Sequence, residues 1–472
     1  MPLGILVSAI FYVLTVQAQG SADAFCLAQA TKSLRMPRRN FRLPSALLCP
    51  SCARIFVASG YSGVLFVKLK SMIFRFLTAG ESHGPSLCAI VEGMPANVPL
   101  VAEQIDTHLA RRQAGYGRGG RMKIETDRVT FSAGVRHGLT IGSPITLNVE
   151  NRDYASWGDV MNPAPVEEYA HDSVKTRPIQ IPRPGHVDWA GGLKYRSVAD
   201  MRNILERASA RETTMRVAAG SVARALLEAC GIFLGSHVVE IGGVNAGEVV
   251  RPSAREINSI ADKSEVRCLD SSVEEKFKSR IDAARESGDT VGGVFEVVAD
   301  GIPVGLGSHV HWDRKLDGRL AGALMSIHAM KGVEIGLGFE AARRSGSQVH
   351  DPFVSGEPLA RPSNNAGGLE GGVTNGEPLV CRVAMKPIST LMNALPSVNV
   401  TTGQATAAHV ERSDYCAVPA AGVVGEAMVA IVLANALLEK FGGDSLEEIV
   451  ERMEVHRAFT LSQIKKWEET GE

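Results

Sequence analysis

Residues 183–231 read RPGHVDWAGGLKYRSVADMRNILERASARETTMRVAAGSVARALLEACG, and this stretch decides how the chain folds. It opens as a loop around His186 and then takes on a helical pattern. Ser209 and Glu212 have the spacing of a capping box, so we expect a helix to begin at Ser209. Gly231 stands where a left-handed cap would end that helix. Apolar residues recur at helical spacing and predict a buried face, formed by Met215, Ala218, Ala219, Val222, Ala223, Leu226 and Leu227.

The start of this predicted helix is rich in arginine. Arg202, Arg207 and Arg211 stand in or beside the turn whose free N–H groups carry the positive end of the helix dipole. This arrangement favours an anion such as phosphate. An ordinary core helix with solvated arginines would show the same local pattern, so the rest of the chain must decide between the two interpretations.

Length and composition indicate a soluble globular protein. Of the 472 residues, 45% are hydrophobic and 21% are charged, which is enough to bury a sizeable core. Residues 1–71 hold eight of the 50 Lys and Arg residues but one of the 51 Asp and Glu residues, so 42 basic and 50 acidic groups remain. Residues 72–472 therefore carry a net negative charge, which does not support a general nucleic-acid surface. Eight scattered cysteines, with one isolated pair at Cys49 and Cys52, favour reduced thiols in an intracellular protein.

Residues 1–71 differ in composition from the rest, and we treat them as an extension outside the fold. Residues 1–22 carry no charge and include an apolar run like the core of a signal peptide, too short for a membrane span. Residues 32–70 are basic and acid-free, as in an organelle transit peptide. We favour a third explanation, that the natural start is Met72, and we expect 72–472 to form a single domain.

His83 lies in a turn between two predicted strands. Residues 74–80 and 86–93 have strand-like patterns, and the turn between them is flanked by glycines. A histidine in a turn is usually a solvated polar residue. It can also act as an acid or base near neutral pH, so His83 is a candidate catalytic group.

A basic, glycine-rich loop follows the amphipathic helix that we expect from about Ala102. Gly115, Gly117 and Gly120 formally match the dinucleotide fingerprint, but that motif must follow a strand and open a helix. This loop follows a helix and leads into a strand-like stretch, so we reject a Rossmann site. An RNA contact is an alternative, although a small polyanion suits an acidic folded protein better. The cations of the loop are Arg111, Arg112, Arg118, Arg121 and Lys123.

Further elements are expected along the rest of the chain. We expect strands at 145–151, 236–250 and 291–307, the last as a strand pair, and helices at 272–287, 421–443 and from Ser445. His309 and His311 would share one face of a strand, but two imidazoles alone are a weak metal signal, and we predict no metal site. Residues 89–95 and 297–303 both end a strand in acid-Gly-apolar-Pro, which suggests an internal duplication.

Nine motifs, in this order, resemble those of chorismate synthase, the last enzyme of the shikimate pathway. They are GESHG at 80–84, RRQAGYGRGGRM at 111–122, RPGHVD at 183–188, KY with D-x-R at 194–202, ERASARET at 206–213, HAMKGVEIG at 328–336, NNAGGLEGG at 364–372, KPIST at 386–390 and RSDYC at 412–416. The resemblance runs from about Phe74 to Met428. No single motif is decisive, but nine in order are specific.

The resemblance implies an α+β sandwich with central helices packed between antiparallel β-sheets. It implies a lyase that performs the 1,4-anti elimination of phosphate from 5-enolpyruvylshikimate 3-phosphate, gives chorismate and requires reduced FMN. The phosphate and two carboxylates of this substrate suit the arginines, and loops such as 363–376 suit a flat flavin ring. The compact body resembles the monofunctional, bacterial or plant-like type, which receives reduced flavin from elsewhere, with NADPH as a candidate reductant.

The resemblance also implies roles for particular residues. His83 and His186 correspond to two acid–base histidines, one protonating the leaving phosphate and the other keeping the flavin anionic. Asp414 corresponds to a carboxylate near flavin N5 that helps to deprotonate the substrate carbon. Arg112 and Arg118 correspond to contacts with NADP or with the substrate phosphate. The FMN contacts correspond to Arg207, Ala208, Ser209, His328, Ala329, Gly371, Lys386, Pro387, Ile388, Ser389, Thr390 and Arg412.

Two positions depart from the family pattern, and two other functions stay open. Many members have histidine where this chain has Ser413, and many have asparagine where it has His328. The alternatives are an NADPH-dependent flavin reductase and an RNA-binding module. As a member of the family, the chain would be a cytoplasmic homotetramer with no nucleic-acid or membrane partner, or a plastid enzyme if 1–71 is a transit peptide.

Overall fold

The computed structural model describes residues 74–119, 126–165, 177–247, 249–354, 360–411 and 413–470. The predicted extension at 1–71 and the end of the basic loop at 120–125 lie outside the described residues. Arg412, one of the predicted flavin contacts, also lies outside them.

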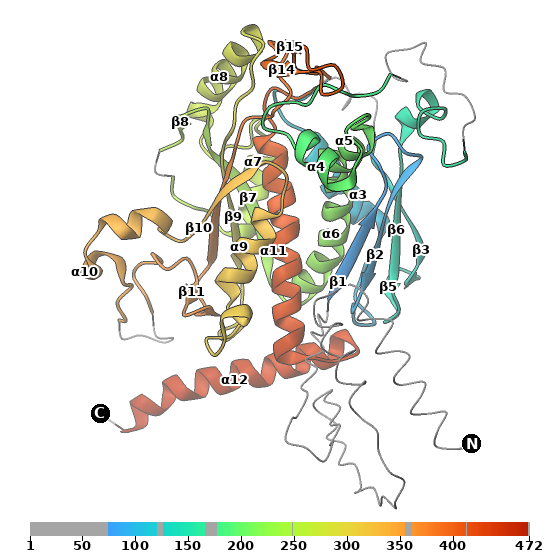
Figure 1. Ribbon diagram of the computed structural model, residues 1–472. Coiled ribbons are helices and arrows are strands. Elements are labelled where there is room, and N and C mark those ends of the chain that lie inside the picture. Colours follow the sequence, from blue (N-terminus) through green and yellow to red (C-terminus); the bar gives the residue numbers. More distant parts are fainter. Residues whose placement is uncertain are drawn as a thin grey trace, which may run out of the picture. The chain divides into compact units, whose positions relative to one another are not determined.

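Two antiparallel sheets face each other across a layer of helices (Figure 1). The first sheet has the order β1 (Arg75–Ala79), β2 (Ser86–Glu92), β6 (Ile145–Glu150) and β3 (Val129–Ala133). The second has the order β10 (Met330–Ile335), β13 (Leu379–Met385), β9 (Gly293–Asp300), β7 (Phe233–Ile241) and β8 (Val244–Asn245). Side chains alternate along each strand, so that Leu87, Ala89 and Val91 of β2 are buried. The predicted α+β class is confirmed.

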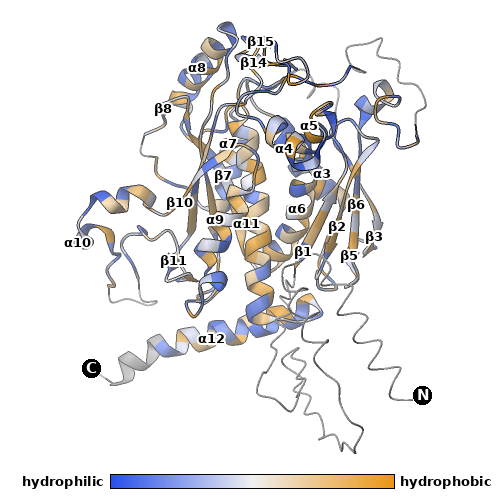
Figure 2. Cartoon of the chain, viewed as in Figure 1, coloured by the Kyte–Doolittle hydropathy of each residue, from blue (hydrophilic) through white to orange (hydrophobic). Residues whose placement is uncertain are grey.

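Two central helices fill the space between the sheets, α6 (Thr213–Ala229) and α11 (Val418–Phe441), with α3 (Ala102–Gln113) and α9 (Leu316–Met325) beside them. The central pair packs closely, because a Cβ on Gly220 would lie 2.4 Å from the Cβ of Ala427. Among the described residues, α11 alone is long and apolar enough to cross a membrane, but its most apolar stretch is buried inside the protein. Its hydrophobic surface (Figure 2) therefore reflects its place inside the fold.

The start of α6 differs from the prediction. A 3₁₀ turn at Ala210–Glu212 comes first, and Ser209 Oγ accepts from the Arg211 N–H at 3.2 Å. Glu212 does not close a capping box, because its carboxylate accepts from the hydroxyl of Thr78 at 2.8 Å. The helix therefore begins at Thr213 rather than Ser209. The predicted left-handed residue after it is confirmed, since Gly231 has a φ of 80°.

Other predicted elements were partly right. The helices α8 (Glu274–Glu286) and α12 (Leu446–Thr470) are confirmed, whereas α4 (Asp188–Tyr195), α5 (Arg202–Ala208) and α7 (Ala254–Ala261) were not predicted. The expected strand pair at 291–307 is wrong in its second half, because the chain turns at Gly301, which has a φ of 79°. His309 and His311 lie in bends and not on a strand. No group of three metal-binding side chains occurs among the described residues.

Short strands and one short helix complete the described elements. They are the pairs β4 (Val135–Arg136) with β5 (Leu139–Thr140), β11 (Leu369–Glu370) with β12 (Val373–Thr374) and β14 (Pro396–Val398) with β15 (Ala405–Ala407), and α10 (Gly346–Val349).

The two halves of the fold share a local hydrogen-bond pattern at the sites of the predicted duplication. The hydroxyl of Thr140 donates to the carbonyl of Pro95 at 2.6 Å, and the hydroxyl of Thr374 donates to the carbonyl of Pro303 at 2.7 Å. Each hydroxyl oxygen also accepts a backbone N–H three residues beyond its proline. The turns after β2 and β9 are thus built alike, which supports an internal duplication.

A buried ionic cluster joins α11 to its neighbours around the fully buried Glu426. Its carboxylate accepts two hydrogen bonds from Arg111 of α3, at 2.8 and 3.0 Å, and one from Arg224 of α6. Ser236 of β7 donates to it at 2.5 Å, and Arg267 lies 3.5 Å away. Burial opposes ionisation, but the arginines hold the pKa of the Glu426 carboxyl below its usual range. The cluster therefore links both central helices to the second sheet.

We expect His108, at the edge of this cluster, to make folding sensitive to acid. Burial, then Arg224 and Arg111, lower the pKa of His108 from 6.5 to about 3. Between these values the unfolded chain binds a proton that the folded chain does not, so stability is lost as pH falls below about 6.5. Urea titrations at several pH values should show a weaker acid dependence in His108→Gln than in the parent. An unchanged dependence would mean that this ring is not responsible.

Candidate active site

A cavity of about 630 Å³ opens beside the start of α6 and the start of α11. Its cationic lining, among the described residues, is Arg112, Arg118, Arg183, Arg202, Arg211 and Lys386. Two carboxylates, Glu411 and Asp414, also line it, so cations exceed anions threefold. Apolar side chains such as Leu205, Met385 and Val424 form part of the wall. The cavity therefore suits a ligand that is both anionic and partly apolar.

His83 stands in the predicted turn between β1 and β2 and lines the cavity. Its Nδ1 lies 2.9 and 3.0 Å from the two carboxylate oxygens of Glu206, and its backbone N–H donates to the same carboxylate at 2.8 Å. The imidazole stacks on Trp157, with ring centroids 3.9 Å apart. The ring is therefore held both at its edge and on its face.

His186 lines the same cavity and lies just before α4. Its Nδ1 lies 2.6 Å from Asp188 Oδ1, and Arg183 donates to the other oxygen of Asp188 at 2.9 Å. Burial would raise the pKa of the Asp188 carboxyl, but hydrogen bonds from His186 and Arg183 hold it below its usual range. Asp188 is thus an ionised anchor for the imidazole at neutral pH.

Arg112 of the basic loop and Arg211 near the start of α6 form a buried pair around Asp127. Arg112 donates to Asp127 Oδ2 at 2.9 Å, and Arg211 donates to Oδ1 at 2.7 Å. Burial lowers the pKa of Arg112 to about 10, with Asp127 opposing the shift, so the guanidinium stays charged at neutral pH. One carboxylate between two arginines leaves a net positive charge beneath the cavity.

Asp414 also lines the cavity, where it contacts the basic loop. Its Oδ2 lies 2.9 Å from Arg118 Nη1, and its Oδ1 accepts from the Gly119 N–H at 2.6 Å. Gly117 has a φ of 83°, and a Cβ added to it would lie 3.2 Å from the Cβ of Cys416. Glycine at this position therefore lets the loop pass close to Cys416. The loop follows the helix α3 and not a strand, which agrees with the rejection of a Rossmann site.

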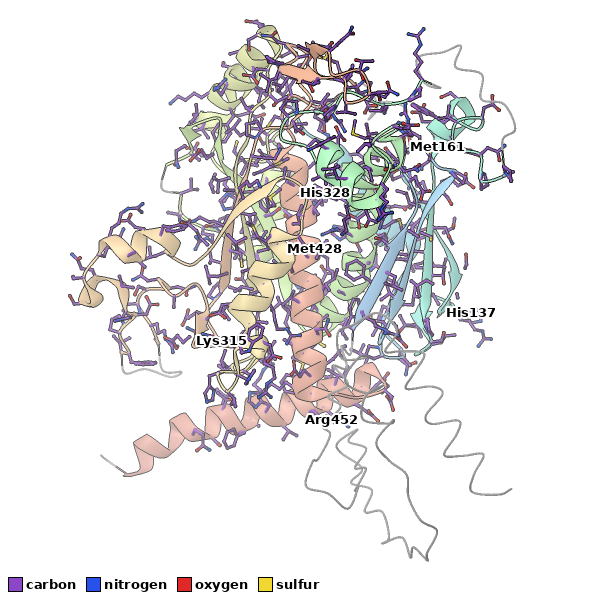
Figure 3. All side chains as sticks on the ribbon, in the orientation of Figure 1. His137, Met161, Lys315, His328, Met428 and Arg452 are labelled. Carbon is purple, nitrogen blue, oxygen red and sulfur yellow. The ribbon has the colours of Figure 1, made fainter. Side chains whose placement is uncertain are left out.

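His328 lies in the turn between α9 and β10 and faces the cavity (Figure 3). Its Nδ1 is buried and has no hydrogen-bond partner among the described residues. Burial lowers the pKa of His328, and Arg216 and Arg207 act in the same direction against Glu212. A neutral ring with an unsatisfied nitrogen is suited to a hydrogen bond with a ligand.

Most of the predicted site residues meet in this one cavity. Those that line it are His83, Arg112, Arg118, His186, Ala208, Ser209, His328, Ala329, Lys386, Ile388, Ser389, Thr390 and Asp414. Arg207 does not line it, since its guanidinium donates to the carbonyls of Thr78 and Gly80. Pro387 does not line it either, and Gly371 lies in the β11–β12 turn outside it.

The sequence analysis missed several residues of the cavity. Arg183 was visible as the first residue of the RPGHVD motif, but its bond to Asp188 was not. Trp157 gave no local signal. Glu206, which contacts His83 but does not line the cavity, was visible only as the first residue of the ERASARET motif. The contacts of both residues with His83 join parts of the chain that are distant in sequence. Arg202 and Arg211, expected near an anion from the helix start, do line the cavity.

Comparison with known proteins agrees with this geometry. Residues 74–438 match the family model for chorismate synthase. The chain is 55% identical over 386 residues to chorismate synthase of Shouchella clausii (strain KSM-K16), covering 81% of this chain and 98% of that protein. It is 54% identical over 387 residues to chorismate synthase 1 of Bacillus thuringiensis (strain Al Hakam), covering 82% and 99%. A crystal structure of chorismate synthase matches with a TM-score of 0.65 and 46% identity, over 82% of this chain and 98% of that one. The chain belongs to the chorismate synthase family.

Proposed function

We propose that this lyase binds 5-enolpyruvylshikimate 3-phosphate in the cavity and eliminates its phosphate to give chorismate, with reduced FMN as cofactor. The observation that carries this proposal is the joint presence of two carboxylate-anchored histidines and six cations around one cavity. The substrate brings a phosphate and two carboxylates, and fixed guanidinium groups are well suited to such anions.

The residues of the cavity also fit a flavin. Reduced FMN combines an anionic phosphate with a flat ring that carries hydrogen-bonding edges, and His328 offers a buried Nδ1 with no partner among the described residues. The bound flavin would lie against Ala208, Ser209, Ala329, Lys386, Ile388, Ser389 and Thr390. When bound, reduced flavin would supply an electron-rich partner for cleavage of the carbon–oxygen bond, with no net oxidation of the product.

The elimination breaks one carbon–oxygen bond and one carbon–hydrogen bond and forms one double bond. We assign proton donation to the leaving phosphate to one of the two histidines, His83 or His186, and control of the protonation state of the cofactor to the other. Asp414 would take the proton from the substrate carbon. Its carboxylate accepts from Gly119 and Arg118 and still has lone pairs for a third partner.

The test separates this lyase from an NADPH-dependent flavin reductase, the second candidate. Pure protein is mixed with NADPH and FMN in air, and NADPH absorbance is followed. We expect no steady consumption of NADPH without another reductase, and phosphate release from the substrate only with pre-reduced FMN. Steady NADPH consumption without substrate would favour the reductase. Whether Arg112 and Arg118 contact substrate or NADP would then follow from competition between the two ligands.

We expect Lys386→Met to weaken binding of an anionic ligand by about 10–150-fold, because a charged hydrogen bond contributes about 1.5–3 kcal/mol. Lys386 lines the cavity and makes a long bond of 3.4 Å to the carbonyl of Pro387, so its loss should leave the thermal midpoint unchanged. Equilibrium dialysis with FMN and with substrate measures the effect. Lys331→Met, an exposed neighbour outside the cavity, is the matched control. Equal affinities in both variants would remove Lys386 from the site.

The oligomeric state and location are further parts of the proposal. We propose a homotetramer, as the family resemblance implies, and a cytoplasmic location, in line with the bacterial relatives. Residues 72–472 would form the catalytic domain, with 1–71 outside it. Light scattering that shows a stable monomer would contradict the tetramer. Mass spectrometry of the native N-terminus would show whether residues 1–71 are present, and a processed N-terminus within them would favour the plastid alternative.

A further inference from the structure

Both cavity histidines are held at Nδ1 by a buried carboxylate, a feature that the proposed reaction does not by itself require. Glu206 lies 2.9 Å from His83 Nδ1, and Asp188 lies 2.6 Å from His186 Nδ1. The side chain of each carboxylate is 1% exposed. Two separate parts of the chain, α5 and the start of α4, thus each present a carboxylate to a cavity histidine.

The bond between Nδ1 and Glu206 determines the tautomer of the His83 ring. An ionised carboxylate can only accept hydrogen bonds, so the ring nitrogen beside it must carry the hydrogen. In a neutral imidazole the other nitrogen, Nε2, then carries the lone pair. A proton gained or given during turnover is therefore exchanged at Nε2, while the hydrogen on Nδ1 stays in place.

The Glu206 carboxylate is positioned to act on His83 in particular. It accepts from the backbone N–H of His83 as well as from the ring, so it fixes the turn and the imidazole together. The nearest arginine nitrogen that pairs with it, on Arg202, is 3.7 Å away. At His186 the arrangement differs, because Arg183 donates to Asp188 at 2.9 Å and its Nη2, which is also a donor, lies 3.0 Å from His186 Nδ1. Glu206 is therefore the clearer of the two cases.

We propose that Glu206 is a positioning residue that fixes His83 as the Nδ1–H tautomer and makes Nε2 its proton-exchanging atom. This inference rests on the proposed function, in which both rings exchange protons. Trp157 assists on the His83 side, because its ring stacks on the imidazole and opposes rotation about the Glu206 bond.

The test is a double-mutant cycle on the full-length protein, with phosphate release from 5-enolpyruvylshikimate 3-phosphate and pre-reduced FMN as the readout. Glu206→Gln keeps the size of the side chain but removes its charge and one acceptor. We expect kcat to fall by about 10–100-fold, the usual cost of losing a partner that orients a histidine, with little change in KM. In a His83→Ala background the same substitution should cost nothing further, because the ring it orients is gone.

Two further variants keep the result interpretable. Glu206→Asp keeps the negative charge but shortens the side chain by one methylene. If Glu206→Gln does not fold, Glu206→Asp takes its place in the cycle. Glu81→Gln removes an exposed carboxylate from the same turn as His83, outside the cavity lining, and should keep full activity. Loss in this control as large as in Glu206→Gln would mean that local charge, and not contact with the ring, causes the effect.

The outcomes separate this inference from the proposed function. An equal loss of kcat from Glu206→Gln with and without His83 would overturn the positioning role, since Glu206 would then act independently of the ring. Full activity in Glu206→Gln, together with an inactive His83→Ala, would also overturn it and leave the proposed function standing. Full activity in His83→Ala would remove the acid–base role of that histidine, and the positioning role with it.

Discussion

Replacing His83 or His186 with alanine is expected to lower turnover by about 10²–10⁴-fold, the usual contribution of a positioned acid or base. Each imidazole lines the cavity and is oriented by a buried carboxylate, so its loss removes a proton-exchanging group from the reaction. Initial rates of phosphate release with pre-reduced FMN measure the effect, and saturation with substrate separates kcat from KM.

The same variants should keep most of their stability and FMN affinity. In His83→Ala the Glu206 carboxylate still accepts from the backbone N–H of residue 83, and in His186→Ala the Asp188 carboxylate still accepts from Arg183. His311→Ala, on an exposed histidine outside the cavity, is the control and should be fully active. A double variant at 83 and 186 that folds and turns over at the parent rate would end the acid–base assignment.

The largest expected loss of stability follows from Glu426→Gln. Removing the charge leaves Arg111, Arg224 and Arg267 buried without their shared anion, and breaking a buried ion pair in this way costs about 3–5 kcal/mol. Because the pKa of Glu426 is held below its ordinary value of 4.5, the stabilisation is present above that pH and is lost as pH falls. Urea unfolding at fixed protein concentration measures the change.

A matched control lies on the same helix. Glu439 is exposed near the end of α11 and pairs with Arg319 at 2.8 Å, with side chains 47% and 26% exposed. Such a surface pair contributes at most about 1 kcal/mol, so Glu439→Gln should unfold close to the parent midpoint. If Glu426→Gln were as stable as Glu439→Gln, the cluster would not be what joins α11 to α3 and α6.

The sequence was most informative where the residues that form a helix or turn and the residues with a predicted chemical role lie in one short stretch. The turn at His83 and the helix from Ala102 lie where their patterns predicted, because glycine placement and apolar spacing are local properties. The start of α6 shows the limit of this reasoning. Ser209 and Glu212 have the spacing of a capping box, but the Glu212 carboxylate bonds Thr78 in the neighbouring strand instead.

The residues that orient the site could not be found in this way. Glu206 is 123 positions from His83 in the sequence, and Asp127 is 84 positions from Arg211, so only the fold brings these residues together. Arg207 shows a second limit. Its neighbours Ala208 and Ser209 line the cavity, but its own guanidinium donates to the carbonyls of Thr78 in β1 and of Gly80 just after it.

The most direct measurement of the central claim is an anaerobic single turnover with limiting 5-enolpyruvylshikimate 3-phosphate and one equivalent of reduced FMN per active site. Phosphate, chorismate and the absorbance of the flavin are followed in the same sample. The account predicts one phosphate and one chorismate for each substrate consumed, with the flavin fully reduced at the end. Absence of phosphate, or oxidation of one flavin for each phosphate released, would contradict it.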